Sequence, residues 1–279
     1  MTRDGHRSSV SSQPRPASGW RRIARSLALL VSLSTSSTMV LAYADLLPQV
    51  MEQEILASPA GGLPHLTRRL AQQGAPLRIV AFGSSSTEGV GASSPAAAYP
   101  ARLEAALRRA LPRLAGGITV LNRGIGGEHA DDMLGRLERD VLAARPDLVI
   151  WQTGSNDPLR GVSLEHFREA TVAGVRRMQA AGSDVVLMEP QWCPKLDATP
   201  DAYRFRDMVR EIGAELGVPV IRRSDLMRDW IAGGRLTREE LFAPDGLHMA
   251  DRGYDLLGQA VARDILRRAQ PVVMAQAGE

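Results

Sequence analysis

The chain has 279 residues, enough for one large domain or two small ones; 44% of them are hydrophobic and 4% are aromatic. Its formal net charge is +3, but the first 44 residues contain six arginines and a single acidic residue, Asp4. The remainder holds 28 of the 34 basic and 30 of the 31 acidic residues, so its net charge is −2. The folded part therefore lacks the positive charge that favours nucleic-acid binding, and we expect no nucleic-acid partner.

The first 44 residues have the organisation of an export signal. Residues 26–44 carry no charge, and Ala42-Tyr43-Ala44 forms a small-x-small cleavage site before Asp45. The alternative is an uncleaved membrane anchor, because this uncharged run approaches the ~20 residues that span a bilayer. We expect a periplasmic or secreted protein, or one anchored in the membrane through residues 26–44 and in contact with a membrane only for that reason. The basic segment before the uncharged run consists of Arg15, Arg21, Arg22 and Arg25.

Residues 45–76 are expected to form a helical lead-in and linker. From residue 77 onward, short apolar segments alternate with amphipathic ones, which predicts a parallel sheet covered by helices on both faces. The fold class is therefore α/β, a three-layer α/β/α sandwich with a five-stranded parallel sheet over residues 77–270, followed by a tail at 271–279. Strands are predicted at 77–82, 118–121, 147–151, 184–188 and 218–221, and helices at 98–110, 130–143, 164–181, 201–216 and 252–268.

Four short polar motifs lie at the ends of these elements. Three of them directly follow strands, and the fourth comes just before the last helix. Because ligands bind at the carboxyl ends of the strands in an open parallel sheet, all four can meet at one edge. In chain order the motifs are Gly83-Ser84-Ser85-Ser86-Thr87, Asn122-Arg123-Gly124-Ile125-Gly126-Gly127, Gly154-Ser155-Asn156-Asp157 and Asp245-Gly246-Leu247-His248.

Ser85 lies three residues after the first predicted strand, where a side chain can project from the sheet edge and act as a nucleophile. A polar turn without chemistry is the alternative, and for this motif alone it is the commoner case. Gly127 permits close approach of a backbone N–H to a ligand oxygen, and the Asn156 amide can donate to a developing oxyanion. Each of these two motifs is also compatible with an ordinary turn.

Asp245 and His248 form the most informative pair. A D-x-x-H loop can bring the carboxylate to one imidazole nitrogen while the other nitrogen faces a nucleophile, which sets the tautomer and stabilises the imidazolium. The alternative is a helix cap with an exposed histidine. Among the other histidines, His129 follows the Gly127 turn, and for it a surface helix start is favoured over a place in the site. Cys193, the single cysteine, is expected to be an unpaired packing thiol.

Together the four motifs resemble the conserved blocks of the SGNH hydrolases, the GDSL-type esterase and lipase family, over about residues 77–268. The resemblance implies a flavodoxin-like sandwich, with Ser85 as nucleophile and His248 as a base held by Asp245. It also implies an oxyanion hole of the Ser85 N–H, Gly127 and Asn156. One position departs from the family, because Gly83-Ser84-Ser85 replaces the usual Gly-Asp-Ser. The neighbouring hydroxyls of Ser84 and Ser86 are the alternative nucleophiles.

These residues predict an exported serine esterase that cleaves carboxylic esters through an acyl-enzyme, with O-acetyl groups on envelope carbohydrate as a candidate substrate. The alternatives are a lysophospholipase-like hydrolase of lipids or thioesters, and a non-hydrolytic acyltransferase or glycan-binding member of a polysaccharide pathway. We expect a small acyl ester or acylated glycan as the partner, and no cofactor. We also expect no metal, because no His, Cys and carboxylate cluster has metal-ligand spacing.

Overall fold

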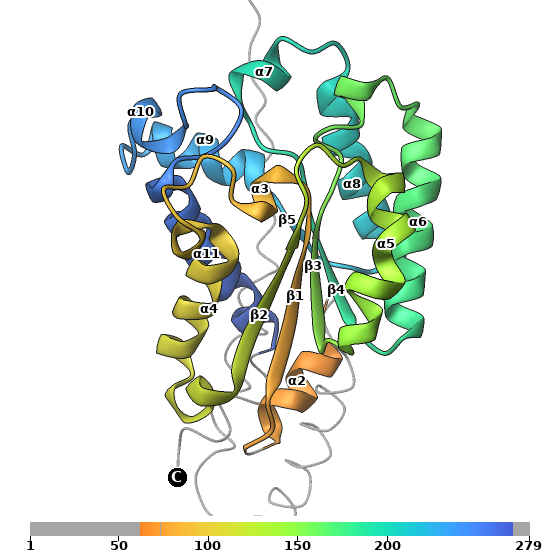
Figure 1. Cartoon of the computed structure of the whole chain (residues 1–279), viewed down its shortest axis with the longest axis vertical. Helices are drawn as coiled ribbons and strands as arrows, with labels where there is room; N and C mark the ends of the chain where they lie inside the picture. Colours follow the sequence, from red (N-terminus) through yellow and green to blue (C-terminus); the bar gives the residue numbers. More distant parts are fainter. Residues whose placement is uncertain (1–61, 73, 270–279) are drawn as a thin grey trace, which may run out of the picture. The chain divides into compact units, whose positions relative to one another are not determined.

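A computed structural model shows a parallel sheet between two layers of helices in the unit formed by residues 54–279, of which residues 62–72 and 74–269 are described (Figure 1). The strand order is β2-β1-β3-β4-β5, and all neighbouring strands are parallel. This is the flavodoxin-like order, in which β2 is added on one side of β1 and β3, β4 and β5 follow on the other side, so that the strand order reverses between β1 and β3. The strands are β1 (Leu77–Gly83), β2 (Ile118–Gly124), β3 (Leu148–Gln152), β4 (Asp184–Met188) and β5 (Val220–Ile221).

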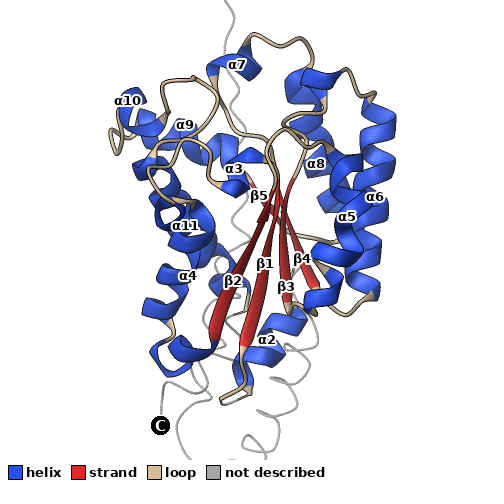
Figure 2. Ribbon diagram, in the orientation of Figure 1, coloured by secondary structure: helices blue, strands red, loops and turns tan. Residues whose placement is uncertain are grey.

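Each face of the sheet is covered by its own helices, as Figure 2 shows. Because side chains alternate along a strand, Ile79 and Ile150 pack on one side while Phe82 and Trp151 pack on the other. The first side is covered by α2 (Pro64–Ala71), α4 (Tyr99–Ala110), α9 (Arg223–Ala232) and α11 (Asp251–Arg268). The second side is covered by α5 (Ala130–Asp140), α6 (Leu164–Ala180) and α8 (Ala202–Leu216).

Part of the predicted lead-in, residues 45–61 and 73, lies outside the described residues. Its described part contains α2, which packs against the body of the fold. Its Leu66 and Leu70 side chains belong to the larger core cluster. The Leu66 N–H donates to the Asp184 carboxylate at 2.8 Å, and Arg69 forms an ion pair with Asp147 at 2.7 Å. Residues 64–71 are therefore anchored to the amino-terminal ends of β3 and β4.

All five predicted strands are present, and the differences lie at element ends and in short helices. β5 has only two residues, and the predicted helix 130–143 ends at Asp140, before a 3-10 turn at Leu142–Ala144. The pattern analysis missed α9 and three single-turn helices, because such short segments carry little periodicity. The single-turn helices are α3 (Ser85–Glu88), α7 (Pro194–Asp197) and α10 (Arg238–Leu241).

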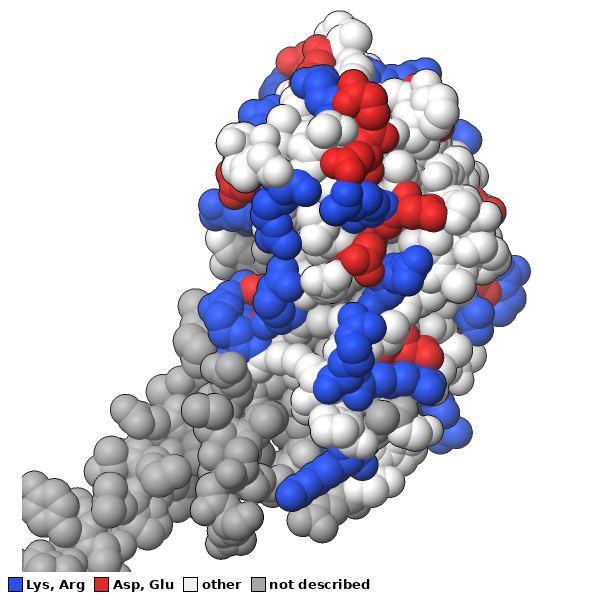
Figure 3. All heavy atoms as spheres, turned by 90° about the vertical axis from the view of Figure 1, so that its left-hand side faces the viewer, with Lys and Arg blue, Asp and Glu red and all other residues white. Residues whose placement is uncertain are grey.

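Arginines lie at the carboxyl ends of α4 and α11. Arg108 and Arg109 lie in the last turn of α4, and Arg267 and Arg268 lie in the last turn of α11. The face in Figure 3 accordingly shows mixed charges in its upper half and mostly basic side chains in its lower half. Cations are favoured at helix carboxyl ends because they complement the helix dipole.

None of the helices in the described part of the chain is both long enough and apolar enough to cross a membrane. The expected signal or anchor at residues 1–44 and the tail at 271–279 lie outside the described residues.

Candidate active site

The three neighbouring serines have distinct surroundings at the carboxyl end of β1. The Ser84 hydroxyl is buried and donates to Gln152 Oε1 at 3.1 Å. The Ser86 side chain is also buried. Ser85 begins α3, and its Oγ lies 2.8 Å from His248 Nε2. Of the three hydroxyls, that of Ser85 is the one placed beside an imidazole.

The loop before α11 brings the predicted Asp245 and His248 together. His248 Nδ1 lies 2.6 Å from Asp245 Oδ2, while Asp245 Oδ1 accepts the backbone N–H groups of Leu247 and His248, both at 2.9 Å. Partial burial opposes ionisation of the carboxyl group, but hydrogen bonds from the His248 ring and these N–H groups outweigh it and lower the pKa of Asp245 to about 2. The carboxylate is therefore ionised at neutral pH, and its contact with Nδ1 leaves Nε2 to face Ser85.

The two other predicted motifs meet beside Ser85. Gly127 adopts a positive φ of 77°, and a Cβ built on its neighbour Gly126 would lie 3.8 Å from Ser85 Cβ. The Asn156 amide donates to the Glu128 carbonyl at 2.8 Å. An Asn amide has two N–H groups, so this bond orients the side chain and leaves one donor available. The glycine turn and Asn156 are thus tied together at the edge where Ser85 lies.

Arg136 on α5 joins three segments of this edge. Its guanidinium donates to the carbonyls of Gly83 at 3.1 Å and Arg123 at 3.0 Å, at the ends of β1 and β2. It also pairs with the Glu128 carboxylate at 2.6 Å, and it lies over the Phe82 ring at 4.5 Å from the ring centroid. Planar guanidinium donors can serve several acceptors at once, so this buried side chain fixes the Glu128 turn relative to the end of β1.

A buried hydrogen-bond network runs beneath the site. Gln152 Oε1 accepts from the Ser84 N–H at 3.0 Å, from the Ser84 hydroxyl at 3.1 Å and from the Thr87 hydroxyl at 3.2 Å. Gln152 Nε2 donates to Ser155 Oγ at 3.2 Å, and Ser155 donates to Gln191 Oε1 at 3.0 Å. Gln191 Nε2 then donates to the Leu247 carbonyl at 3.3 Å, within the loop between Asp245 and His248.

The sequence analysis did not identify Gln152, Gln191 or Arg136. The available signal was Gln152 itself, a polar residue at the end of an otherwise apolar strand. Its partners come from other parts of the chain, so their contacts depend on the tertiary fold. Arg223 also belongs to this network, because its guanidinium donates to Gln191 Oε1 at 2.6 Å. The side chain is fully buried, and burial lowers the pKa of Arg223 to about 10.

His129 and Cys193, which the sequence analysis did not favour as site residues, lie in a helix cap and in the core, respectively. His129 caps α5, where its ring accepts the Asp132 N–H at 3.4 Å and Asp132 accepts the His129 N–H at 3.2 Å. Cys193 is a free, buried thiol whose pKa is raised by burial. Within residues 62–72 and 74–269, no group of three or more His, Cys, Asp or Glu side chains is arranged to hold a metal ion.

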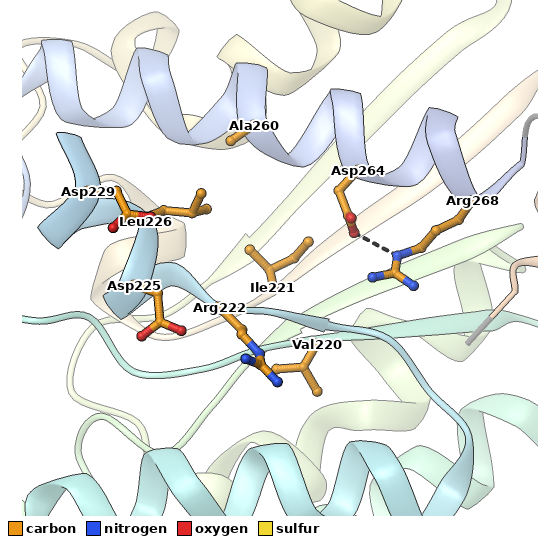
Figure 4. A pocket seen from close by; sticks show the side chains of 9 residues that line it. All are labelled: Val220, Ile221, Arg222, Asp225, Leu226, Asp229, Ala260, Asp264 and Arg268. Atoms are coloured by element: carbon orange, nitrogen blue, oxygen red, sulfur yellow. Dashed lines mark hydrogen bonds and ion pairs between the residues drawn. The ribbon is translucent and has the colours of Figure 1, made fainter. Parts of the chain in front are cut away.

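A pocket of about 300 Å³ lies elsewhere, between β5, α9 and α11 (Figure 4). Its walls combine apolar side chains with Asp264 and Arg268, which pair at 2.8 Å. None of the predicted site residues lines it. This pocket is therefore separate from the Ser85 edge.

Comparison with known proteins connects this site to a family. The model of the Non-GDSL lipase-like family matches residues 51–271. The uncharacterised lipoprotein YqeF of Bacillus subtilis is 26% identical over 218 residues, which are 66% of this chain and 87% of YqeF.

Two solved structures share the fold. The lipase/acylhydrolase from Enterococcus faecalis has a TM-score of 0.57 and 28% identity, over 70% of this chain and 98% of the other. A two-domain esterase active on acetylated mannans has a TM-score of 0.63 and 26% identity, over 75% of this chain and 54% of the other. Because the family model spans most of the chain, the resemblance to the SGNH and GDSL-type hydrolases is confirmed, and the protein belongs to the Non-GDSL lipase-like family.

Proposed function

We propose that the protein hydrolyses carboxylic esters with Ser85 as nucleophile. The observation that carries this proposal is the continuous chain from Ser85 Oγ through His248 to Asp245, with distances of 2.8 and 2.6 Å. His248 Nε2 takes the Ser85 proton as Oγ attacks the ester carbonyl, and the ionised Asp245 stabilises the imidazolium. The imidazolium protonates the departing alcohol, and water then releases the acid from the acyl-enzyme by the same steps.

The oxyanion that forms during attack needs donors beside Ser85. Ser85 is the first residue of α3, so its N–H has no acceptor within that helix. The Gly127 N–H and the second Asn156 N–H complete the proposed set. The hydrogen bond from Asn156 to Glu128 supports this role, because a donor that is already oriented needs no reorganisation in the transition state.

The surface beside Ser85 favours a short acyl group. In the described part of the chain, the large hydrophobic side chains that are exposed are Val90 and Ile125. Both adjoin the nucleophile segment, since the Val90 N–H donates to the Ser85 carbonyl at 3.0 Å and the Ile125 N–H donates to the Gly83 carbonyl at 3.1 Å. Two such side chains offer less apolar surface than a long acyl chain requires. We therefore propose acetyl esters, and O-acetylated carbohydrate as their carrier.

We also propose that the enzyme works outside the cytoplasm, as the basic and uncharged segments of residues 1–44 indicate. The similarity to the lipoprotein YqeF agrees with a place at the cell envelope. The catalytic domain is assigned to residues 77–270, with α2 packed onto it.

Hydrolysis of p-nitrophenyl acetate, butyrate and octanoate by the purified protein tests the proposal. We expect acetate to be the best of the three, and Ser85→Ala to lower kcat by roughly 10⁴- to 10⁶-fold, as in other serine hydrolases. A fluorophosphonate adduct should map to Ser85 by mass spectrometry. An adduct on Ser84 or Ser86, or an active Ser85→Ala variant, would overturn the assignment.

A further inference from the structure

Three aromatic rings and a group of arginines gather beside the proposed active site. Trp192 follows β4, and its ring meets that of Phe242 edge-on at 5.7 Å between centroids. The Arg238 guanidinium carbon lies 5.0 Å from the centroid of Trp192 and 5.8 Å from that of Phe242. The Arg228 guanidinium carbon lies 5.6 Å from the Trp192 centroid and 5.7 Å from that of Tyr203. We call these five residues the arginine–aromatic cluster.

The cluster is connected to the catalytic loop by backbone contacts. Phe242 forms an antiparallel bridge with Met249, and the Ala243 N–H donates to the His248 carbonyl at 2.9 Å. Phe242 and Tyr203 also belong to one apolar cluster with Leu247. In Figure 1 the helices that carry or flank the cluster, α7, α9 and α10, lie at the same end of the fold as α3, which begins at Ser85. The cluster therefore adjoins the loop that carries Asp245 and His248.

Arg228 and Arg238 are both exposed. In the described part of the chain, neither Arg228 nor Arg238 has a carboxylate within ion-pair distance. The Asp197 carboxylate accepts hydrogen bonds from two rings of the cluster, from Trp192 Nε1 at 3.1 Å and from the Tyr203 hydroxyl at 2.5 Å. Backbone and Thr237 hydrogen bonds at the start of α10 lower the pKa of Glu239, and the charge of the neighbouring Arg238 lowers it further without a close ion pair.

Stacking on rings orients a guanidinium without using its N–H donors. The planar group attracts the ring face electrostatically, and its edges stay free for two parallel hydrogen bonds to a carboxylate or phosphate. Arg206, which lies over Tyr203 at 5.0 Å, differs in this respect because it pairs with Asp207 at 2.7 Å. Arg228 and Arg238 are therefore the cations of this group that remain available to a ligand.

We propose that Arg228 and Arg238 bind a carboxylate on the alcohol part of the substrate, so that the enzyme prefers acetyl esters of an acidic, uronic-acid-containing carbohydrate. This inference rests on the proposed ester hydrolysis and specifies its substrate. A carbohydrate is favoured over a lipid because Val90 and Ile125 are the exposed large hydrophobic side chains of the described residues. Neither belongs to the cluster, whose three rings are half-buried.

The test compares two substrates with the same sugar chain and acetyl groups: an O-acetylated oligogalacturonide with free carboxylates, and the same oligosaccharide with its carboxyl groups neutralised as methyl esters. Acetate release by the full chain should show a kcat/KM at least roughly tenfold higher for the charged form, because a hydrogen bond to a charged group contributes a factor of about ten or more. The preference should arise mainly in KM and should shrink at 0.5 M NaCl, since exposed charges are screened by salt. Equal values for the two substrates would overturn the proposal.

Variants locate the effect on the chain. The preference is the kcat/KM for the charged substrate divided by the kcat/KM for the neutral one. Arg228→Gln and Arg238→Gln should each reduce this ratio by roughly three- to tenfold. Arg235→Gln is the matched control, because Arg235 is also exposed, lies between α9 and α10, and contacts none of the three rings. It should leave the ratio unchanged. A loss of the ratio in Arg235→Gln equal to that in Arg238→Gln would point to general surface charge and would contradict a defined subsite.

Two further assays separate this inference from the proposed function. If p-nitrophenyl acetate is not hydrolysed, the esterase assignment itself fails. If p-nitrophenyl acetate is hydrolysed but neither oligosaccharide releases acetate, only the carbohydrate inference fails. Lysophosphatidylglycerol is the third substrate. If it is hydrolysed faster than acetate is released from the oligosaccharides, and if this rate depends on Arg238, the arginines bind a phosphate headgroup and the proposal of a carbohydrate substrate is wrong.

Discussion

Replacing Gln152 tests whether the network beneath Ser85 stabilises the fold and holds Ser85, the proposed nucleophile, in place. Gln152→Met keeps an unbranched side chain of similar length and removes the amide oxygen and nitrogen, so the loss of packing is small. Gln152, Ser84 and Thr87 are all buried. The change leaves three buried donors without their acceptor: the Ser84 N–H, the Ser84 hydroxyl and the Thr87 hydroxyl.

The expected cost follows from these three donors. An unsatisfied buried donor costs about 1–3 kcal/mol, and the two hydroxyls can rotate toward other acceptors, so we take the lower end for each and expect a loss of roughly 3 kcal/mol. For a domain of this size each kcal/mol lowers the melting temperature by about 2–4 °C, so Tm should fall by roughly 6–12 °C. Because Ser84 adjoins Ser85, kcat for p-nitrophenyl acetate should fall as well.

Thr153→Val provides the matched control in the neighbouring residue. Thr153 is fully buried, and its hydroxyl has no hydrogen-bond partner, so removing it should be neutral or stabilising. Urea denaturation followed by tryptophan fluorescence measures the free energy of unfolding of both variants. If Gln152→Met is no less stable than Thr153→Val, the network does not contribute the stability that its geometry implies.

Three further predictions concern the surrounding residues. Arg136→Met should lower the free energy of unfolding by about 3–5 kcal/mol, because it leaves the Glu128 carboxylate without its partner; an unchanged urea midpoint would contradict this. Asn156→Ala should lower kcat by roughly 10²- to 10³-fold with little change in KM, and an intact kcat in steady-state assays would leave Asn156 with only its bond to Glu128. Burial raises the pKa of Asp157 above its usual value, and its Oδ2 has no partner, so the folded state favours the protonated form. Asp157→Asn should therefore gain stability over wild type as pH rises above about 4, where the unfolded carboxyl ionises, and urea midpoints that differ equally at pH 3.5 and pH 7 would refute this.

Much of the fold could be predicted from local patterns. The apolar runs at 77–82, 147–151 and 184–188 are strands in the structure, because a strand buried on both faces is continuously apolar. The sequence also drew attention to Ser85, Asp245 and His248, since each lies in a short polar motif at an element end, and the structure places their side chains in contact. The pattern analysis placed the start of α11 within one residue. It missed α9 and extended β5 by two residues, because packing against the sheet and pairing with β4 decide those boundaries.

The sequence by itself determined which residue types lie at the sheet edge, because each motif follows from its position after a strand or before a helix. Only the tertiary structure decided which of three adjacent serines faces His248, since that choice depends on a loop 163 residues away. The same holds for Gln152, Arg136 and the cluster around Trp192, whose partners are brought together by β3, α5, α9 and α10. These contacts join side chains that are distant along the chain, and their distances are set by how helices and strands pack, a property that no local pattern contains.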